Sequence, residues 1–468
     1  MLEAEMTQIE AMMESLAQRR TMLRRRINAL SPTSQLPQEI LTEIFRLASH
    51  SSEDGPRSTT PLFFGGICKE WRDIAWSTPL LWNSVSLHVS RRTHGSQVHL
   101  LRDWLLRANS SPLYIKLTTD DEHESIFCSL RAIMDVLVAR SAFWYSLDCL
   151  LPPQCHEVLK SNQFPMLTSV SIRPPKGTIS TFSEPPNMFL SAPKLLNVDL
   201  SGYNFPAMVL PWEQLQRFKT QFLTVGECLK VLRRSPNLKE CHLESVYSPD
   251  LLSSPTMNPL HSELEYLEVT LIKGAAISLL DSITLPSLCD LHIVYSGPGG
   301  FLLSAISSLV LRSSCNLQRL HIEKQNFHDD DLIPCLDAMS SLSHLHLTVL
   351  ADGIHPSMGL TTKLVTMLQP SHQSGPPLLP NLHTFEYRGR ILCDGHSLVS
   401  MLSERFHAKQ ADASKLECPP VVRLTAARII SPAAFDLSDE LQSELLKLSE
   451  AGMEVNIRST DGTPSSRF

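Results

Sequence analysis

The chain has 468 residues, of which 43% are hydrophobic and 19% charged, and its formal net charge is -7. This composition excludes a largely disordered chain, a collagen and a coiled-coil rod, and the acidic balance provides no basic field that would recruit nucleic acid. The length exceeds one compact core, so we expect about three domains, or one elongated repeat array with a cap.

The cysteines and the apolar runs indicate the compartment. The 11 cysteines form no CxxC pair and follow no regular spacing, which is untypical of a secreted disulfide scaffold. The sequence begins with acidic residues where a signal peptide needs basic ones, and no apolar run reaches about 18 residues. We therefore expect a cytoplasmic or nuclear protein with neither a membrane nor a nucleic-acid partner.

Residues 1–30 predict a helix with one apolar seam. Its apolar residues follow one another at steps of four and three, and Arg20 fills the one missing place: Leu2, Met6, Ile9, Met13, Leu16, Leu23, Ile27 and Leu30. Such a seam favours a helix that packs along one face or pairs with another helix. We expect an amphipathic helix that lies on its own domain. A homodimer through this helix is the alternative.

Residues 31–90 predict a small helical bundle. Pro37 suits the first turn of a helix, and the residues after it carry one apolar stripe at helical spacing: Ile40, Leu41, Ile44, Phe45 and Ala48. Residues 49–61 are expected to form a loop. A second helical pattern follows in FFGGICKEWRDIAW, and the alternation around Val85 predicts a strand.

Three tryptophans lie close together in this segment: Trp71, Trp76 and Trp82. A segment this short cannot bury so much apolar surface within itself. It either packs on the rest of the chain or presents a face to a partner.

Three sequence blocks in this segment, LPQEILTEIF, ICKEWRDIA and STPLLWNSVSL, follow one another between Leu36 and Val89. Together they resemble the F-box, in the form common in large fungal F-box families. The resemblance implies a helical bundle that docks on the Skp linker subunit of Cullin–RING (SCF) ubiquitin ligases. The long polar loop between the first two blocks departs from the family, which has a short helix-bearing connection there. The residues that the resemblance places at the linker are Leu36, Pro37, Ile40, Leu41, Ile44, Phe45, Ile67, Cys68, Lys69 and Trp71.

Residues 91–430 contain a degenerate repeat of the form apolar-x-x-apolar-x-apolar. Its copies are LTSVSI, LLNVDL, LKECHL, LEYLEV, LCDLHI, LQRLHI, LSHLHL and LHTFEY, and helical patterns such as GECLKVLRRS lie between them. A strand and a helix at a period of about 20 to 29 residues are typical of leucine-rich repeats. The asparagine that usually follows the strand is absent. We predict an α/β fold: a small all-α bundle followed by an irregular, leucine-rich-repeat-like solenoid of parallel strands and helices.

Residues 431–458 predict a cap for the last repeat. LSDELQSELLKLSEAG has a helical pattern that ends near Gly452, and MEVNIRS follows as a short strand. A polar terminal unit of this kind is expected where a repeat array ends. Residues 459–468 are predicted to be a flexible tail.

One side chain per repeat lies between the second and third apolar positions, and alternation places all of them on one face of the sheet. They are Ser171, Asp199, His242, Glu268, His292, His321, His346 and Glu386. We interpret all but Ser171 as a substrate-binding face. Its neighbours are Tyr266, Arg319, Glu323, His344 and Arg388. The alternative is a row of solvated residues without a partner. Because histidine titrates near pH 6.5, binding to this face is expected to depend on pH.

Patterns that would indicate catalysis are incomplete. No nucleotide-binding GxxxxGK[ST] or GxGxxG motif occurs. An HExxH zinc motif begins at His156, but Lys160 replaces its second histidine ligand. A nucleophile-elbow pattern surrounds Ser397, but Val399 replaces one of its glycines. His344 and His346 share a strand face, but no acid or cysteine at a fixed offset completes a metal site. We expect no catalytic residue, cofactor or metal.

Taken together, the sequence favours a non-catalytic substrate-recognition adaptor of an SCF-type ubiquitin ligase. In this interpretation the F-box binds the Skp linker and the repeat region binds a substrate protein. The alternative is a Skp-binding or scaffold protein without a role in ubiquitin transfer.

Overall fold

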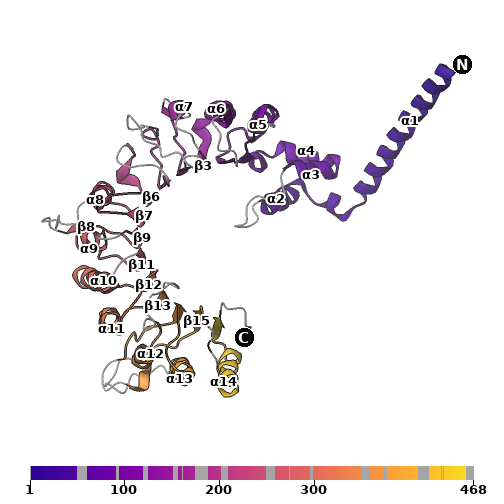
Figure 1. Ribbon diagram of the computed structural model, residues 1–468. Coiled ribbons are helices and arrows are strands. Elements are labelled where there is room, and N and C mark those ends of the chain that lie inside the picture. Colours follow the sequence, from indigo (N-terminus) through magenta and orange to yellow (C-terminus); the bar gives the residue numbers. More distant parts are fainter. Residues whose placement is uncertain are drawn as a thin grey trace. The chain divides into compact units, whose positions relative to one another are not determined.

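The computed structural model describes residues 2–49, 61–90, 94–119, 125–150, 156–160, 162–173, 188–201, 209–248, 259–272, 275–295, 299–349, 359–372, 377–408, 421–433, 435 and 437–459. The chain forms two compact units. One consists of Met1–Thr178 and Pro186–Leu195, and the other of Ile179–Pro185 and Leu196–Phe468. The expected domain boundary after residue 90 therefore falls inside the first unit. Each unit is mixed α/β with parallel strands (Figure 1).

The first unit begins with helices and continues as alternating strands and helices. Its elements are α1 (Leu2–Ala29), η1 (Pro32–Gln35), α2 (Gln38–Ser49), α3 (Pro61–Ile67), α4 (Lys69–Ser77), η2 (Pro79–Trp82), β1 (Ser84–His88), α5 (His94–Ala108), β2 (Leu113–Thr118), α6 (Ser125–Val138), η3 (Ser141–Phe143), β3 (Trp144–Leu150), α7 (His156–Lys160) and β4 (Ser169–Arg173). Strands β1 to β4 pair in chain order, all parallel.

The second unit repeats the strand–helix alternation. Its elements are β5 (Asn197–Asp199), η5 (Trp212–Gln214), β6 (Arg217–Gln221), α8 (Val225–Arg234), β7 (Glu240–Val246), β8 (Leu260–His261), β9 (Tyr266–Leu271), α9 (Ala275–Leu280), β10 (Ile283–Thr284), β11 (Asp290–Tyr295), α10 (Gly299–Ser313), β12 (Arg319–Glu323), α11 (Asp329–Asp337), β13 (His344–Thr348), α12 (Thr362–Leu368), η6 (Pro370–His372), β14 (Thr384–Arg388), α13 (Gly395–Phe406), β15 (Ala426–Ser431), α14 (Asp439–Glu450) and β16 (Glu454–Ser459). All eight copies of the sequence repeat contain parallel strands: β4, β5, β7, β9, β11, β12, β13 and β14.

The sheet of the second unit buries one face and leaves the other open. Apolar side chains that face the helices lie in register from strand to strand, as Leu267, Leu291, Leu320, Leu345 and Phe385 show, and each is at most 1% exposed. Helices α8 to α14 lie on that side of the strands (Figure 1), and neighbouring helices pack on one another. The alternation that predicted the strands thus also separates the core from the open face.

The described chain ends in a helix, α14, and a strand, β16, in the segment predicted as a cap. Ser438 caps α14 by accepting a hydrogen bond from the Leu441 backbone N–H. Gly452, with φ of +96°, ends the helix in a conformation that glycine adopts readily. Strand β16 then pairs with β15. The predicted tail lies outside the described residues except for Ser459.

Two predictions for the N-terminal segment need correction, and the first concerns α1. It is helical, but it does not lie on its own domain, because none of its side chains from Leu2 to Ala29 is buried. The seam residues together with Leu30 are between 53% and 80% exposed. Ser31 and Leu36 flank η1 in extended conformations, and the chain enters α2 without bringing the seam back onto the bundle.

The second correction concerns FFGGICKEWRDIAW, which forms two helices and not one. Cys68 adopts an extended conformation (φ −151°, ψ 171°) between α3 and α4. Its sulfur accepts a hydrogen bond from the Trp71 backbone N–H at 3.4 Å, so that it caps α4. Gly65 in α3 lies under the ring of Trp76, where a Cβ atom would clash. The predicted loop 49–61 lies almost entirely outside the described residues.

Candidate partner-binding surfaces

The N-terminal bundle has an aromatic core. The rings of Phe45 and Phe64 stack with centroids 4.3 Å apart, and Trp71 packs against Phe45 at 4.9 Å. Trp82 is fully buried, and its indole N–H donates to the Ala75 carbonyl oxygen at 2.7 Å. The clustered tryptophans and phenylalanines therefore hold the short helices together.

The structure divides the ten residues assigned to the Skp linker by their burial. Leu41 and Phe45 are at most 1% exposed and belong to the core. Cys68 and Trp71 are half-buried, and Pro37 and Lys69 are exposed. Leu36, Ile40, Ile44 and Ile67 are between 37% and 49% exposed. The exposed residues can contact a partner directly, whereas Leu41 and Phe45 support the helix that presents them.

Helix α2 thus carries apolar side chains on two sides. Leu41 and Phe45 face the core, while Ile40, Ile44 and Leu47 follow one another at i, i+4 and i+7 on the solvent side. Leu62 and Phe63 on α3 are also exposed, by 42% and 54%. Sequence reasoning did not assign Leu47, Leu62 and Phe63. A cluster of exposed apolar side chains of this kind marks an interaction surface.

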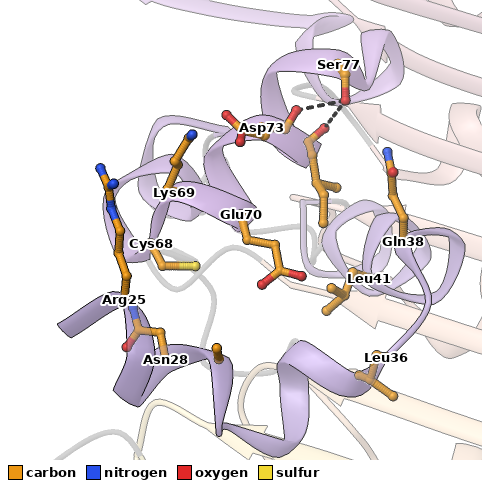
Figure 2. A pocket seen from close by; sticks show the side chains of 12 residues that line it. Arg25, Asn28, Leu36, Gln38, Leu41, Cys68, Lys69, Glu70, Asp73 and Ser77 are labelled. Atoms are coloured by element: carbon orange, nitrogen blue, oxygen red, sulfur yellow. Dashed lines mark hydrogen bonds between the residues drawn. The ribbon is translucent and has the colours of Figure 1, made fainter. Parts of the chain in front are cut away.

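A pocket of about 610 Å³ adjoins this surface. It lies between the end of α1, the start of α2 and helix α4, and its lining includes Asn28, Leu36 and Cys68. Glu70 extends into the middle of this hollow (Figure 2). The pocket is therefore a mixed polar and apolar recess beside the exposed leucine and isoleucine side chains.

A continuous line of polar side chains crosses the open face of the second unit. We call it the polar row: Asp199, Lys219, His242, Glu268, His292, His321, His346, Glu386, Arg428 and Asn456. Each member is the direct cross-strand partner of the next. All seven residues predicted for this face belong to it, and Lys219, Arg428 and Asn456 extend it. Ser171 lies in the first unit, opposite Asp148.

Glu268 is the acceptor for two neighbours in the row's first half. Its Oε2 atom lies 2.8 Å from His242 Nδ1 and accepts a hydrogen bond from the Tyr266 hydroxyl at 3.0 Å. These hydrogen bonds, that from His242 above all, lower the pKa of Glu268 to about 2 against the opposing effect of burial. Glu268 is therefore ionised at neutral pH and fixed between two strands.

Three histidines form a stack in the centre of the polar row. The rings of His292 and His321 are nearly parallel with centroids 3.9 Å apart, and those of His321 and His346 lie 3.8 Å apart. Burial, together with repulsion by the two neighbouring imidazoles, lowers the pKa of His321 to about 3. Burial also lowers the pKa of His346. His321 is therefore neutral at pH 6.5, so the pH dependence expected from its ordinary pKa does not apply to it.

The C-terminal end of the polar row has charged side chains beside a pocket. Glu386 Oε2 lies 3.8 Å from His346 Nδ1 and 3.5 Å from Arg428 Nη1. A pocket of about 540 Å³ is lined by Glu386, Arg428 and Asn456, among others. This end can accept a charged or amide side chain of a partner.

The same strands carry one further row of side chains on each side of the polar row. Arg319 and Asp290 precede their polar-row residues by two positions, so they lie on the same face in a neighbouring row, and they form an ion pair of 2.6 Å. Glu323, Thr348 and Arg388 lie in register on the row two residues later. Tyr266, Arg319, Glu323, His344 and Arg388, the neighbours named from the sequence, thus flank the polar row on both sides.

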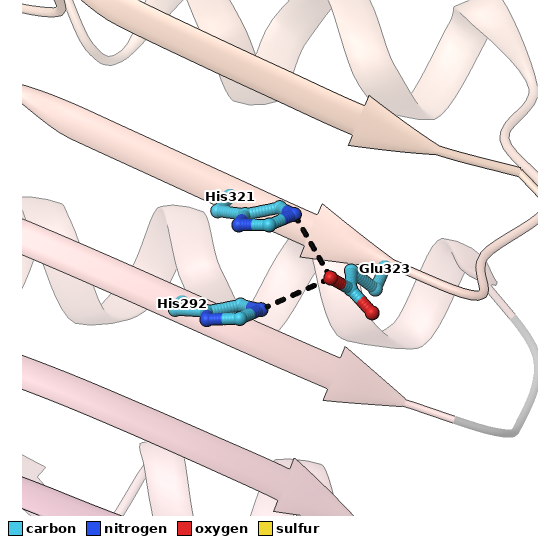
Figure 3. Close-up of side chains that lie close together, drawn as sticks. All are labelled: His292, His321 and Glu323. Carbon is cyan, nitrogen blue, oxygen red and sulfur yellow. Dashed lines mark ion pairs between the residues drawn. The ribbon is translucent and has the colours of Figure 1, made fainter. Parts of the chain in front are cut away.

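The histidine pair considered from the sequence as a metal site has other partners. His344 Nδ1 lies 2.8 Å from the Ser343 hydroxyl, and His346 Nε2 lies 3.1 Å from the Thr348 hydroxyl. A different group comes together: His292 Nε2 and His321 Nε2 lie 3.5 Å and 3.1 Å from Glu323 Oε1 (Figure 3). Glu323 was foreseen as a neighbour of the binding face and not as part of such a group.

Ser397 occupies a structural position. Its backbone N–H and its hydroxyl both donate to the Asp394 carboxylate, at 2.8 Å and 2.7 Å, at the N-terminus of α13. This arrangement is a helix cap.

No helix within the described part of the chain is both long and apolar enough to cross a bilayer. The sequence was also compared with known proteins. No protein-family model matches it, and no curated protein has significant similarity to it.

Proposed function

We propose that the chain is the substrate-recognition adaptor of an SCF-type ubiquitin ligase. The observation that carries the proposal is the apolar solvent face of α2, with Ile40, Ile44 and Leu47 exposed above an aromatic core. This face coincides with the sequence blocks that resemble the F-box. Exposed apolar helix faces are stable in complexes, where a partner covers them.

In this proposal the Skp linker covers α2 and the start of α4. Leu36, Ile40 and Ile44 supply the apolar anchors, and Ile67 and Lys69 extend the contact. An interface of ordinary size buries about 1,600 Å² in total, and a few buried anchors dominate its affinity. The pocket beside Leu36 and Cys68 provides a recess for a side chain of the linker.

The remaining strands and helices form a leucine-rich-repeat-like solenoid whose polar row binds the substrate protein. Support comes from the eight sequence copies that become parallel strands and from the unbroken register of the polar row. The adaptor makes and breaks no bonds. It raises the effective concentration of the substrate at a ubiquitin-charged partner, which contributes the entropic part of catalysis.

A pull-down with the purified full chain tests the docking step. Wild-type chain should retain the Skp linker, and a Leu36→Ala, Pro37→Ala double variant should lose most of it, because each truncated anchor costs about 1–2 kcal/mol or more if it is a hot spot. Leu311→Ala is the matched control, since Leu311 on α10 is 66% exposed and lies in the other unit. Absence of binding by a folded wild-type chain contradicts the proposal.

A further inference from the structure

Strands β11 and β12 bring three metal-ligating side chains together at the centre of the polar row. His292 and His321 are cross-strand neighbours, and Glu323 follows His321 by two residues and so faces the same side of the sheet. One nitrogen of each histidine and one carboxylate oxygen of Glu323 all lie within 4.8 Å of one another. Figure 3 shows both rings directing a nitrogen toward the same carboxylate.

The two nitrogens that face Glu323 lack hydrogen bonds. Nε2 of His292 and Nε2 of His321 are both buried, and neither has a hydrogen-bond partner among the described residues. Buried polar atoms in folded proteins nearly always have a partner, because leaving one unsatisfied is costly. A bound cation would supply the missing partner to both nitrogens at once.

We propose that His292, His321 and Glu323 bind one divalent transition-metal ion, with Zn²⁺ as the best match. Zinc takes nitrogen and carboxylate ligands in tetrahedral geometry at about 2.0–2.1 Å, which separates neighbouring ligand atoms by roughly 3.3 Å. The two nitrogen-to-oxygen separations are 3.5 Å and 3.1 Å. The stacked rings need to tilt toward each other so that both lone pairs reach the same ion.

Imidazole binds a metal in its neutral form, and each histidine offers one ring nitrogen to the site. Three protein ligands leave one tetrahedral position open, as in sites where zinc takes an exogenous ligand. The three ligands lie on the face of the sheet that is free of helices. If the proposed function holds, a carboxylate, imidazole or thiolate of the substrate protein completes the coordination.

Isothermal titration with zinc chloride tests the site. The full chain, produced without a histidine tag and freed of metal by a chelator, should bind one ion per chain, and Co²⁺ in its place should give the visible absorption of a tetrahedral complex. His321→Ala and Glu323→Gln should each weaken binding at least tenfold and abolish that spectrum. His344→Ala is the matched control. His344 lies on the same face of the sheet, but its cross-strand partner is Arg319, which is not one of the three proposed ligands.

Equal affinity in wild type and His321→Ala would overturn this assignment, as would an equal loss in His344→Ala or the absence of zinc binding by wild type. Binding that survives in both histidine variants would locate the ion at other ligands, such as cysteines. Zinc binding needs no linker protein. Its failure is therefore distinguishable from failure of the adaptor proposal.

A second inference rests on α1 and is independent of the metal site. The helix exposes its whole apolar seam. Its flanking charges are sorted along its length: Glu3, Glu5 and Glu10 lie beside the seam in the first half, and Arg19, Arg24 and Arg26 lie beside it in the second half. An uncovered seam with charges sorted in this way constrains the helix that can cover it.

Heptad geometry decides between the two orientations of a second copy. The seam residues occupy heptad positions a and d, which places Glu5 and Arg19 at position g and Glu10 and Arg24 at position e. In a parallel pair, position g of one helix meets position e of the next heptad on the other helix. Glu5 would then meet Glu10, and Arg19 would meet Arg24, which are two repulsive contacts. In a fully overlapped antiparallel pair, Glu3 meets Arg24 and Glu5 meets Arg26. Both of these contacts are attractive, and the twofold symmetry repeats each of them.

We infer that α1 pairs antiparallel with α1 of a second copy of this chain. The seam residues then form layers in which Leu2 lies opposite Ile27, Met6 opposite Leu23, and Met13 opposite Leu16. Arg20 lies opposite Ile9, so one polar position per chain interrupts the apolar seam. A single polar seam residue of this kind lowers the stability of a coiled coil and fixes its register.

Analytical ultracentrifugation of the full chain tests the orientation with charge exchange. Wild type should dimerise reversibly. A Glu3→Arg, Glu5→Arg variant and an Arg24→Glu, Arg26→Glu variant should each be monomeric at concentrations where wild type is dimeric. An equimolar mixture of the two variants should restore a heterodimer, because every exchanged pair is attractive again.

A parallel pair predicts the opposite result for each variant alone. The arginine introduced at position 5 would then meet Glu10, and the glutamate introduced at position 24 would meet Arg19, so a repulsive contact becomes attractive in each case. Tighter self-association of either variant therefore overturns the antiparallel assignment. A wild-type chain that stays monomeric over the accessible concentration range overturns the dimer itself.

Discussion

The imidazole rings of His292 and His321 lie parallel within 4° of each other, with centroids 3.9 Å apart. This stack exists because the two histidines occupy the same position in consecutive repeats and β11 pairs with β12 in register. Two positive charges at this separation would repel each other strongly. The stack therefore disfavours simultaneous protonation of adjacent rings, and its stability depends on pH.

Stability is expected to fall as the solution is acidified. His321 has its pKa lowered from 6.5 to about 3 in the folded chain, so the unfolded chain binds a proton that the folded chain does not. Its contribution is complete above pH 6.5 and is lost as the pH falls from 6.5 toward 3. Glu268, with its pKa lowered from 4.5 to about 2, adds a loss of the same sign below pH 4.5.

Thermal unfolding of the chelator-treated chain between pH 7.5 and pH 4.5 checks this prediction. The midpoint should fall with pH, and His321→Gln should reduce the slope because it removes the titrating group. His261→Gln is the control, since His261 lies outside the stack and its side chain is 64% exposed. An unchanged slope in His321→Gln would contradict the assignment.

Substitutions at two neighbouring residues of α2 should affect the stability of the bundle very differently. Phe45→Ala removes a fully buried ring that stacks on Phe64 and should destabilise the bundle by about 3–5 kcal/mol. Ile44→Ala truncates a side chain that is 44% exposed and should leave the unfolding free energy within about 0.5 kcal/mol of wild type. Denaturant titration of the two variants measures both values. A large loss in Ile44→Ala would place Ile44 in the core.

Arg405 should be essential to the second unit. It is fully buried and donates to the carbonyl oxygens of Leu368 at 2.6 Å, Leu379 at 3.0 Å and Leu378. Burial lowers its pKa to about 10, so it remains charged at neutral pH.

Replacement by alanine removes the guanidinium donor from three carbonyl groups, of which, among the described residues, only that of Leu379 still accepts from a backbone N–H, that of Leu382. It should cost on the order of 3 kcal/mol or more. Arg405→Lys should lose much of the same stability, because an ammonium group cannot reproduce the planar guanidinium fork. Arg131→Ala is the control at an exposed i,i+4 ion pair and should change stability by less than about 1 kcal/mol. Equal effects of Arg405→Ala and Arg131→Ala in chemical denaturation would contradict the assigned role.

The capping box of α8 supports a smaller prediction. Thr224 Oγ1 accepts from the Glu227 backbone N–H, while the Glu227 carboxylate accepts from the Thr224 backbone N–H. Thr224→Ala should destabilise the chain by about 1 kcal/mol, and Thr224→Ser should lose much less, since serine caps equally well. Urea unfolding midpoints of the two variants check this difference, and similar losses in both would argue against the hydroxyl contact.

Strand alternation predicted much of the candidate binding face. The apolar repeat predicted seven members of the polar row because each of their sequence copies carries apolar residues at all three positions. Lys219 and Asn456 were not predicted because Thr220 and Gly452 stand where the pattern requires an apolar residue, and Arg428 was not predicted because the small Ala427 makes its copy a weak match. Thr220 is nevertheless only 1% exposed, so burial follows the position in the sheet and not the residue type.

Long-range contacts were beyond the sequence pattern. Nothing in the local sequence around Arg405 distinguishes this buried arginine from a solvated one, because its partners lie 26 to 37 residues away. The seam of α1 predicted a covered face, but its spacing is the same for a domain contact and for a second helix. Only the exposure of the seam side chains in the folded chain distinguishes a contact with the chain's own domain from a seam left free for a second helix.

The affinity of the full chain for the purified Skp linker tests the central proposal most directly. Isothermal titration should give a weaker complex for an Ile40→Ser, Ile44→Ser double variant by at least tenfold, since both side chains lie on the proposed contact face of α2. A Leu106→Ser, Leu311→Ser variant, altered at two other exposed leucines, should bind like wild type. Equal affinities of the two double variants, or no binding by a folded wild-type chain, would contradict the adaptor function.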